Sequence, residues 1–183
     1  MQNLNHRHGL GTWLNENNLV GFGVEVGSLH GSYAKIILDS WRGEYLWMVD
    51  PWATQLSGDY RESTNTETNF SAAFELCQEI ARSFPRRVSL LRHLSLDAAP
   101  QFGDGSLDFV YLDGNHSYEA VLADLDAWYP KVKPGGLFCG HDYVNDVTTP
   151  GWDCEVKRAL DEWCAPRNLV PHLTSCTSWW ILK

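Results

Sequence analysis

The sequence predicts an α/β fold: a mostly parallel β-sheet with helices on both of its faces. Apolar segments of strand length alternate with segments of helical periodicity, which is typical of parallel sheets. The last two apolar segments are joined only by "SCTS", a connection short enough to require antiparallel pairing, so one strand at the end of the sheet is expected to be antiparallel. With 183 residues, 44% of them hydrophobic, the chain suits a single domain over residues 1–183.

The expected strands are short apolar runs, some of them apolar along nearly their whole length, as buried parallel strands are. "LVGFGVEVG" and "LDFVYLD" are the clearest examples. The strand segments are residues 19–27, 44–50, 87–93, 107–113, 137–142, 168–174 and 178–182.

Between these runs, apolar residues recur at intervals of three and four, the period of an amphipathic helix. Tyr118, Val121, Leu125 and Trp128 form one such face. "KPGG" at 133–136 is expected to be a turn, and residues 6–8 a mobile N-terminus, within a helical cap segment over 1–18. The helix segments are residues 32–41, 70–84, 118–132 and about 153–164.

Composition narrows the function classes. The net charge is −9 and no basic block is visible, which argues against nucleic-acid and anionic-membrane partners. The first residues lack an apolar signal-peptide core, so we expect a cytoplasmic protein. The five cysteines are scattered without a CxxC pair, which favours reduced thiols over disulfides or a zinc site.

Polar residues follow the expected strands at the edge where ligands of parallel sheets bind. The first turn, from Gly27, lacks the second glycine of a dinucleotide fingerprint, and no Walker loop is present. Asp50, at the end of the second strand, is placed to accept hydrogen bonds from ribose hydroxyls. This combination indicates a nucleoside ligand without phosphate, such as S-adenosylmethionine. The alternative is an ordinary tight turn with a surface aspartate.

Three segments carry a family resemblance: "VEVGSLHGSYAKIIL", "LDFVYLDGNHSYEAVLADLDAWYPKVKPGGLFCGHDY" and "TSWWILK". Together they resemble class I S-adenosylmethionine-dependent methyltransferases, in the branch of macrocin O-methyltransferase-like and cephalosporin-hydroxylase-like proteins. The resemblance covers about residues 20–183 and implies a Rossmann-like seven-stranded sheet with an antiparallel last strand. The cofactor-binding residues it implies are Glu25, Gly27 and Ser28 at the methionine end, Asp50 at the ribose, Leu94 and Ser95 at the adenine, and Asp113.

Asp113 and Asp142 are expected at the ends of adjacent strands, where two carboxylates repel each other unless a cation lies between them. In metal-dependent members of the resembled family the matching acids hold a divalent cation, so we expect Mg²⁺ or Mn²⁺ here, with His141 as a further ligand. The sequence departs from the family at His141 and Tyr143. Without a metal, one aspartate would cap a loop and the other would contact substrate.

His116 follows Asp113 at the spacing that holds a basic residue in catechol-type relatives. An imidazole titrates near neutral pH and is suited to accept the proton of an attacking hydroxyl. Asp113 is the other candidate base, and packing at the start of the following helix is the structural alternative for His116.

We therefore expect methyl transfer from S-adenosylmethionine to a hydroxyl of a small molecule, for example a sugar or another polyol-like metabolite. The alternatives are a non-catalytic S-adenosylmethionine-binding module and an iron-dependent oxygenase using His116, His141 and an aspartate. Loops 53–69 and 144–152 are expected to determine the acceptor. Tyr60 and Arg61 are expected in a solvated loop, with a lid over the substrate as the alternative, and Trp152 either walls the substrate pocket or packs in the core. The sequence leaves the oligomeric state open, a homodimer included.

Overall fold

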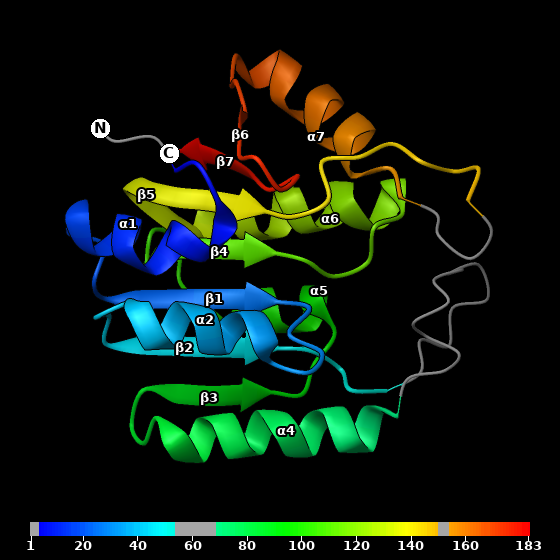
Figure 1. Cartoon of the computed structure of the whole chain (residues 1–183). Coiled ribbons are helices and arrows are strands. Elements are labelled where there is room, and N and C mark those ends of the chain that lie inside the picture. Colours follow the sequence, from blue (N-terminus) through cyan, green and yellow to red (C-terminus); the bar gives the residue numbers. More distant parts are fainter. Residues whose placement is uncertain (1–3, 54–68, 150–153) are drawn as a thin grey trace.

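The structure, a computed structural model, describes residues 4–53, 69–149 and 154–183. Its centre is a seven-stranded sheet in the order β3-β2-β1-β4-β5-β7-β6 (Figure 1). The strands β1 to β5 pair in parallel, and β7 runs antiparallel to both β5 and β6. This confirms the predicted fold class, with the antiparallel strand one position in from the edge. The strands are β1 Phe22–Val26, β2 Tyr45–Val49, β3 Val88–Leu91, β4 Leu107–Leu112, β5 Val132–Gly140, β6 His172–Leu173 and β7 Trp179–Leu182.

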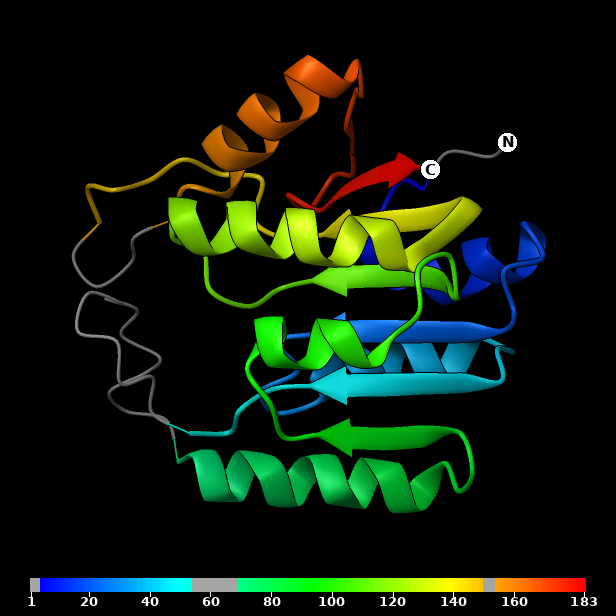
Figure 2. The same ribbon diagram turned by 180° about the vertical axis from the view of Figure 1, so that it is seen from behind.

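Helices cover both faces of the sheet (Figures 1 and 2). Helices α1, α2 and α4 contribute to one hydrophobic core cluster, and α5, α6 and α7 to the other. The short helix α5 was not predicted, because four residues are too few to show a periodicity. The helices are α1 Leu10–Glu16, α2 Ser32–Ser40, α4 Phe70–Ser83, α5 Ser95–Ala98, α6 Tyr118–Trp128 and α7 Val156–Cys164. In the described ranges no helix combines the length and apolar character that crossing a bilayer requires.

Strand β4 joins the two cores. All of its residues are buried, and successive side chains point to opposite faces: Val110 and Leu112 pack with α6 and α7, whereas Phe109 and Tyr111 pack with α1 and α2. Burial on both faces explains why the sequence of this strand is almost continuously apolar. The central strand is therefore held from both sides.

The "KPGG" segment was wrongly predicted to be a turn. It lies within β5, where the register against β4 shifts between Leu107 and Phe109. Gly135 has a φ of 78°, and its amide donates to the carbonyl of Lys183 over 2.6 Å. A glycine in the left-handed region is what such a bulge requires, so the chain bends here without leaving the sheet.

Backbone hydrogen bonds extend the parallel ladder past the strand ends and so bring the residues that follow β1, β2, β4 and β5 to one edge. The four bonds run from Gly27 N to Val49 O at 2.8 Å, Asp50 N to Leu91 O at 3.2 Å, Asp113 N to Val26 O at 2.8 Å and His141 N to Leu112 O at 3.0 Å.

Gly27 permits the closest approach at this edge. Its φ is +87°, and a Cβ atom built on it would lie 2.0 Å from the carbonyl oxygen of Asp113. The neighbour is backbone and has little freedom to move. Gly27 is therefore needed for the packing of the β1 turn against the segment after β4, in addition to any contact with a ligand.

We predict that Gly27→Ala lowers the free energy of unfolding by more than about 2 kcal/mol, from a left-handed backbone and a backbone clash together. Chemical denaturation measures this loss. Gly103→Ala is the matched control, because its new Cβ would meet nothing closer than Ser106 Cβ at 4.0 Å. Equal stability of the two variants would contradict the prediction.

Candidate active site

A cavity of about 650 Å³ opens at the carboxyl edge of the sheet, between the ends of β1, β2 and β4. Its lining comes from segments far apart in the chain, which the ladder bonds hold together. The structure brings all of the predicted cofactor-binding residues, and the candidate base, to this one cavity. They are Glu25, Gly27, Ser28, Asp50, Leu94, Ser95, Asp113 and His116.

Glu25 is a buried acid at the end of β1, with 2% of its surface exposed. The hydroxyl of Ser28 donates to its Oε2 over 2.6 Å. Burial raises the pKa of Glu25 to about 8, helped by the charges of Asp113 and Asp50 and opposed by the Ser28 hydrogen bond. This end of the cavity is therefore suited to a positively charged group, which would favour the ionised carboxylate.

Asp50 is also buried, and it holds two loops together. Its Oδ2 accepts from the amide of Leu29 at 3.0 Å, and its Oδ1 from the amide of Trp52 at 2.7 Å. Burial raises the pKa of Asp50, although these amides and the charge of His30 act to lower it. Each carboxylate oxygen has a second lone pair. Asp50 is thus able to bind a hydroxyl and also supports the local fold.

Asp124 on α6 is a residue of the cavity that sequence reasoning missed. It is 6% exposed and accepts a hydrogen bond from the Ser95 hydroxyl. Burial raises its pKa to about 6, while the Ser95 bond and the charge of His116 act to lower it. A signal was present in the sequence: Asp124 falls in the buried stripe formed by Val121, Leu125 and Trp128, where an acid is unexpected.

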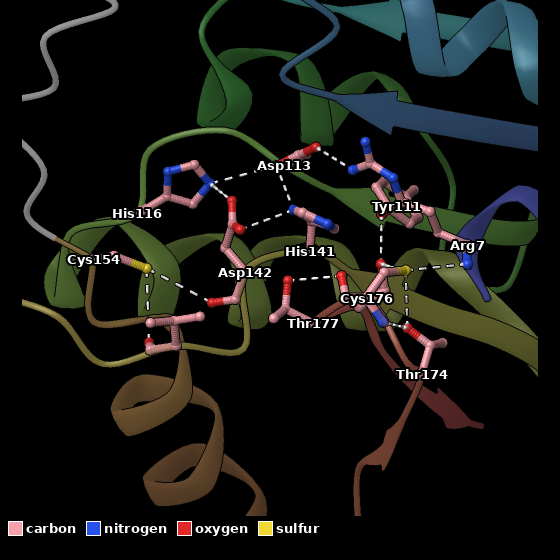
Figure 3. A network of polar contacts seen from close by, with 12 residues as sticks. Arg7, Tyr111, Asp113, His116, His141, Asp142, Cys154, Thr174, Cys176 and Thr177 are labelled. Atoms are coloured by element: carbon pink, nitrogen blue, oxygen red, sulfur yellow. Dashed lines mark hydrogen bonds and ion pairs between the residues drawn. The ribbon is translucent and has the colours of Figure 1, made fainter. Parts of the chain in front are cut away.

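Next to the cavity, two aspartates and two histidines form a cluster (Figure 3). His116 Nε2 lies 3.5 Å from Asp113 Oδ1 and 3.4 Å from Asp142 Oδ2. His141 Nδ1 lies 2.9 Å from Asp142 Oδ1 and 4.0 Å from Asp113 Oδ1. The predicted metal-ligand residues and the predicted base therefore meet in one place.

Three of these residues, Asp113, His141 and Asp142, each offer one ligand atom within 4.8 Å of the other two. Burial acts to lower the pKa of His141, but Asp142 and Asp113 raise it overall. Burial acts to raise the pKa of Asp142, but the two imidazoles lower it overall. Asp142 has a φ of 53°, an uncommon conformation that turns its carboxylate toward the cluster.

Residues 6–8 were wrongly predicted to be mobile. The amide of Ser175 donates to Asn5 O over 2.9 Å, and the amide of Arg7 donates to Cys176 Sγ over 3.4 Å. The Tyr33 hydroxyl donates to Arg7 O over 2.9 Å. These contacts direct the Arg7 guanidinium to the cluster, 4.0 Å from Asp113 Oδ2 (Figure 3). Polar residues at a chain end gave no sign of such long-range contacts. Tyr60, Arg61 and Trp152 lie outside the described residues.

The strand order and the antiparallel β7 form a Rossmann-like seven-stranded sheet. The model of a family described as "Methyltransferase domain" matches residues 24–143, more than half of the chain. The chain therefore belongs to this family, whose methyl donor is S-adenosylmethionine.

Individual relatives are distant. The uncharacterized protein y4gI of Sinorhizobium fredii is 28% identical over 141 residues, which are 74% of this chain and 15% of that relative. The O-methyltransferase NovP has a TM-score of 0.65 at 21% identity, over 97% of this chain and 77% of that one. An O-methyltransferase from Bacillus cereus, in complex with SAH, has a TM-score of 0.63 at 15% identity, and the match covers 97% of this chain and 80% of that one. At these identities the two structures show a shared fold.

The burial of Glu25 predicts a pH-dependent stability of the ligand-free protein. A carboxyl whose pKa rises from 4.5 to about 8 on folding stabilises the fold below pH 4.5, and this contribution is lost as the pH rises through about 8. Between pH 5 and 8 the free energy of unfolding of wild type should fall by several kcal/mol relative to that of Glu25→Gln, since one pKa unit corresponds to about 1.4 kcal/mol. Urea denaturation at both pH values measures this.

Glu79→Gln, on the exposed side of α4, is the control and should follow wild type at both pH values. If the free energies of unfolding of wild type and Glu25→Gln differed by the same amount at pH 5 and pH 8, the predicted burial of a protonated Glu25 would be contradicted.

Proposed function

We propose that this domain transfers the methyl group of S-adenosylmethionine to a hydroxyl oxygen of a small molecule, for example a sugar or another polyol-like metabolite. The observation that carries the proposal is the meeting, at one cavity, of a nucleoside-type lining with the acid–histidine cluster. The cavity supplies a place for the donor, and the cluster supplies groups that bind and deprotonate a hydroxyl. O-methyltransferases among the structural neighbours support the same acceptor class.

In the proposed orientation the methionine end of the cofactor lies against Glu25 and Ser28, and the ribose lies against Asp50. The methyl group then faces Asp113 and His116, the two residues shared by the cavity and the cluster. Methyl transfer needs the donor carbon, the acceptor oxygen and the leaving sulfur in line, so holding both partners in place supplies most of the catalysis.

His116 is the proposed proton acceptor. Its Nε2 lies between the carboxylates of Asp113 and Asp142, at 3.5 and 3.4 Å, and both favour an imidazolium as it forms. Loss of the hydroxyl proton to the imidazole leaves the oxygen a better nucleophile as the carbon–oxygen bond forms and the carbon–sulfur bond breaks. Asp113 is the alternative acceptor, since it also lines the cavity.

The donor atoms of Asp113, His141 and Asp142 fit a divalent cation, because they converge within 4.8 Å. Two carboxylates suit Mg²⁺ or Mn²⁺, and the imidazole shifts the preference toward Mn²⁺. A bound cation would lower the pKa of an acceptor hydroxyl. This convergent set holds one histidine and two aspartates, so it favours cation-assisted transfer over the two-histidine site of an iron oxygenase.

The direct test uses S-adenosylmethionine labelled in its methyl group, with a panel of sugars, polyols and catechols and with small molecules that co-purify with the protein. We expect label in a hydroxyl-derived ether of at least one acceptor. Tight binding of the cofactor without transfer to any acceptor would favour a non-catalytic binding module.

Asp50→Ala should weaken binding of S-adenosylhomocysteine about 10- to 100-fold, the effect of losing one charge-assisted hydrogen bond. Calorimetry measures the affinity. The variant should also be less stable, because the amides of Leu29 and Trp52 lose their acceptor. Asp39→Ala, on the exposed side of α2, is the control. Unchanged affinity in Asp50→Ala would rule out the ribose assignment.

Asp142→Ala should abolish binding of Mn²⁺, followed by electron paramagnetic resonance, whereas His116→Ala should retain both Mn²⁺ and S-adenosylhomocysteine. Turnover of His116→Ala should fall about 10²- to 10⁴-fold, the usual contribution of a positioned proton acceptor. Full wild-type turnover in chelator would remove the cation from the mechanism. A fully active His116→Ala enzyme would make Asp113 the base.

A further inference from the structure

Arg7 is a cation beside the acid–histidine cluster for which the proposed methyl transfer has so far no role. Its guanidinium lies 4.0 Å from Asp113 Oδ2 (Figure 3) and over the ring of Tyr33, 5.0 Å from the ring centroid. Asp113 and Tyr33 both line the cofactor cavity. The positive charge is therefore held where the cavity meets the cluster, next to the place that the acceptor hydroxyl must occupy.

Backbone atoms, and not the guanidinium, make the contacts that hold Arg7 in this position. The Arg7 amide donates to Cys176 Sγ, and the Arg7 carbonyl accepts from the Tyr33 hydroxyl. Two residues earlier, Asn5 O accepts from both the amide and the hydroxyl of Ser175. The guanidinium is therefore available to a ligand, and replacing it should leave these anchoring bonds intact.

The guanidinium has hydrogen-bonding capacity to spare. It carries five N–H donors in a planar fork whose geometry matches a carboxylate. Of the described residues, Tyr111 is close enough to accept from it, whereas Asp113 Oδ2, at 4.0 Å, is beyond hydrogen-bond distance. The Arg7 side chain keeps 28% of its surface exposed, so a molecule in the site has access to the remaining donors.

The charges of the cluster leave Arg7 without a counterion of its own. The carboxylates of Asp113 and Asp142 have the imidazoles of two histidines within ion-pair distance, and these histidines are His116 and His141. A divalent cation at the same carboxylates would compensate them equally well. The guanidinium, which is charged at all relevant pH values, is then in excess. An acceptor with a negative charge near its hydroxyl would restore the balance.

We propose that Arg7 determines the acceptor class: the acceptor is a hydroxy acid, such as a sugar acid, whose carboxylate pairs with the Arg7 guanidinium while its hydroxyl lies at Asp113 and His116. The inference rests on the proposed O-methyl transfer and narrows its acceptor. In the described part of the chain no second arginine or lysine pairs with the cluster, so the site suits the single charge of a carboxylate better than the double charge of a phosphate.

Methyl transfer from labelled S-adenosylmethionine to matched pairs of acceptors tests the proposal. Each pair is a hydroxy acid and its primary amide, which keeps the hydroxyl and the shape but removes the charge. The pairs are gluconate and gluconamide, glucuronate and glucuronamide, and lactate and lactamide. For at least one pair, wild type should show a kcat/KM about 10-fold or more higher for the acid than for the amide, the effect of one charge-assisted hydrogen bond.

Arg7→Gln should lower this acid-to-amide ratio about 10-fold or more, whereas Arg7→Lys, which keeps the charge but not the fork, should retain part of it. Arg42→Gln is the matched control. Arg42 is exposed and lies between α2 and the start of β2, at the edge of the sheet away from the cavity, so this variant should keep the wild-type ratio. If Arg7 only oriented Asp113, Arg7→Gln would slow both acceptors alike, and the unchanged ratio would overturn the proposal.

Equal use of acid and amide by wild type would also overturn the proposal, and this measurement needs no variant to fold. Label found only in uncharged or phosphorylated acceptors would do the same, while leaving the O-methyltransferase assignment intact. Label in no acceptor of any kind would overturn the proposed function and the inference together.

Discussion

The hydrogen-bond ladder that continues past the ends of β1, β2, β4 and β5 is the constraint on which the site depends. It fixes the first residue after each strand, and with it the carboxylates of Asp50 and Asp113 and the imidazole of His141. Gly27 allows the β1 turn to pass close to the backbone after β4. The groups of the proposed active site are thus positioned by the rigid part of the sheet, as a site that works by alignment requires.

The electrostatics of the cavity place function in conflict with stability. Its described lining contains five acids but no lysine or arginine; the acids are Glu25, Asp50, Asp97, Asp113 and Asp124. Burial raises the pKa of Glu25 and Asp124, so each ionised carboxylate costs the empty protein free energy. A ligand with a sulfonium, an ammonium and an amino group would offset that cost. The acids that destabilise the free protein are therefore the ones whose ionised form the proposed cofactor would stabilise most.

Much of the fold followed from periodicity, since buried parallel strands and amphipathic helices leave strong patterns. The strand-end rule also placed Asp50, Asp113 and His116 at one cavity, because parallel strands end at a common edge. Features that depend on long-range contacts were not predictable. The bulge at Gly135 depends on pairing with Lys183, and the order of residues 4–9 depends on Tyr33 and the β6–β7 loop. Asp124, by contrast, could have been found from its place in the buried stripe of α6, where an acid is unexpected.

Asp113 connects the two halves of the proposed reaction. It lines the donor cavity, its Oδ1 faces the two histidines, and its Oδ2 faces Arg7. The two oxygens therefore meet different partners: Oδ1 can bind a cation or an acceptor proton while Oδ2 remains near a guanidinium that stays charged at all relevant pH values. Since the Arg7 segment is anchored to Tyr33 and Cys176, rotation of the Asp113 carboxylate would give up that charge pairing. The N-terminal segment thus contributes to the orientation of Asp113, the group at which donor and acceptor would meet in the proposed reaction.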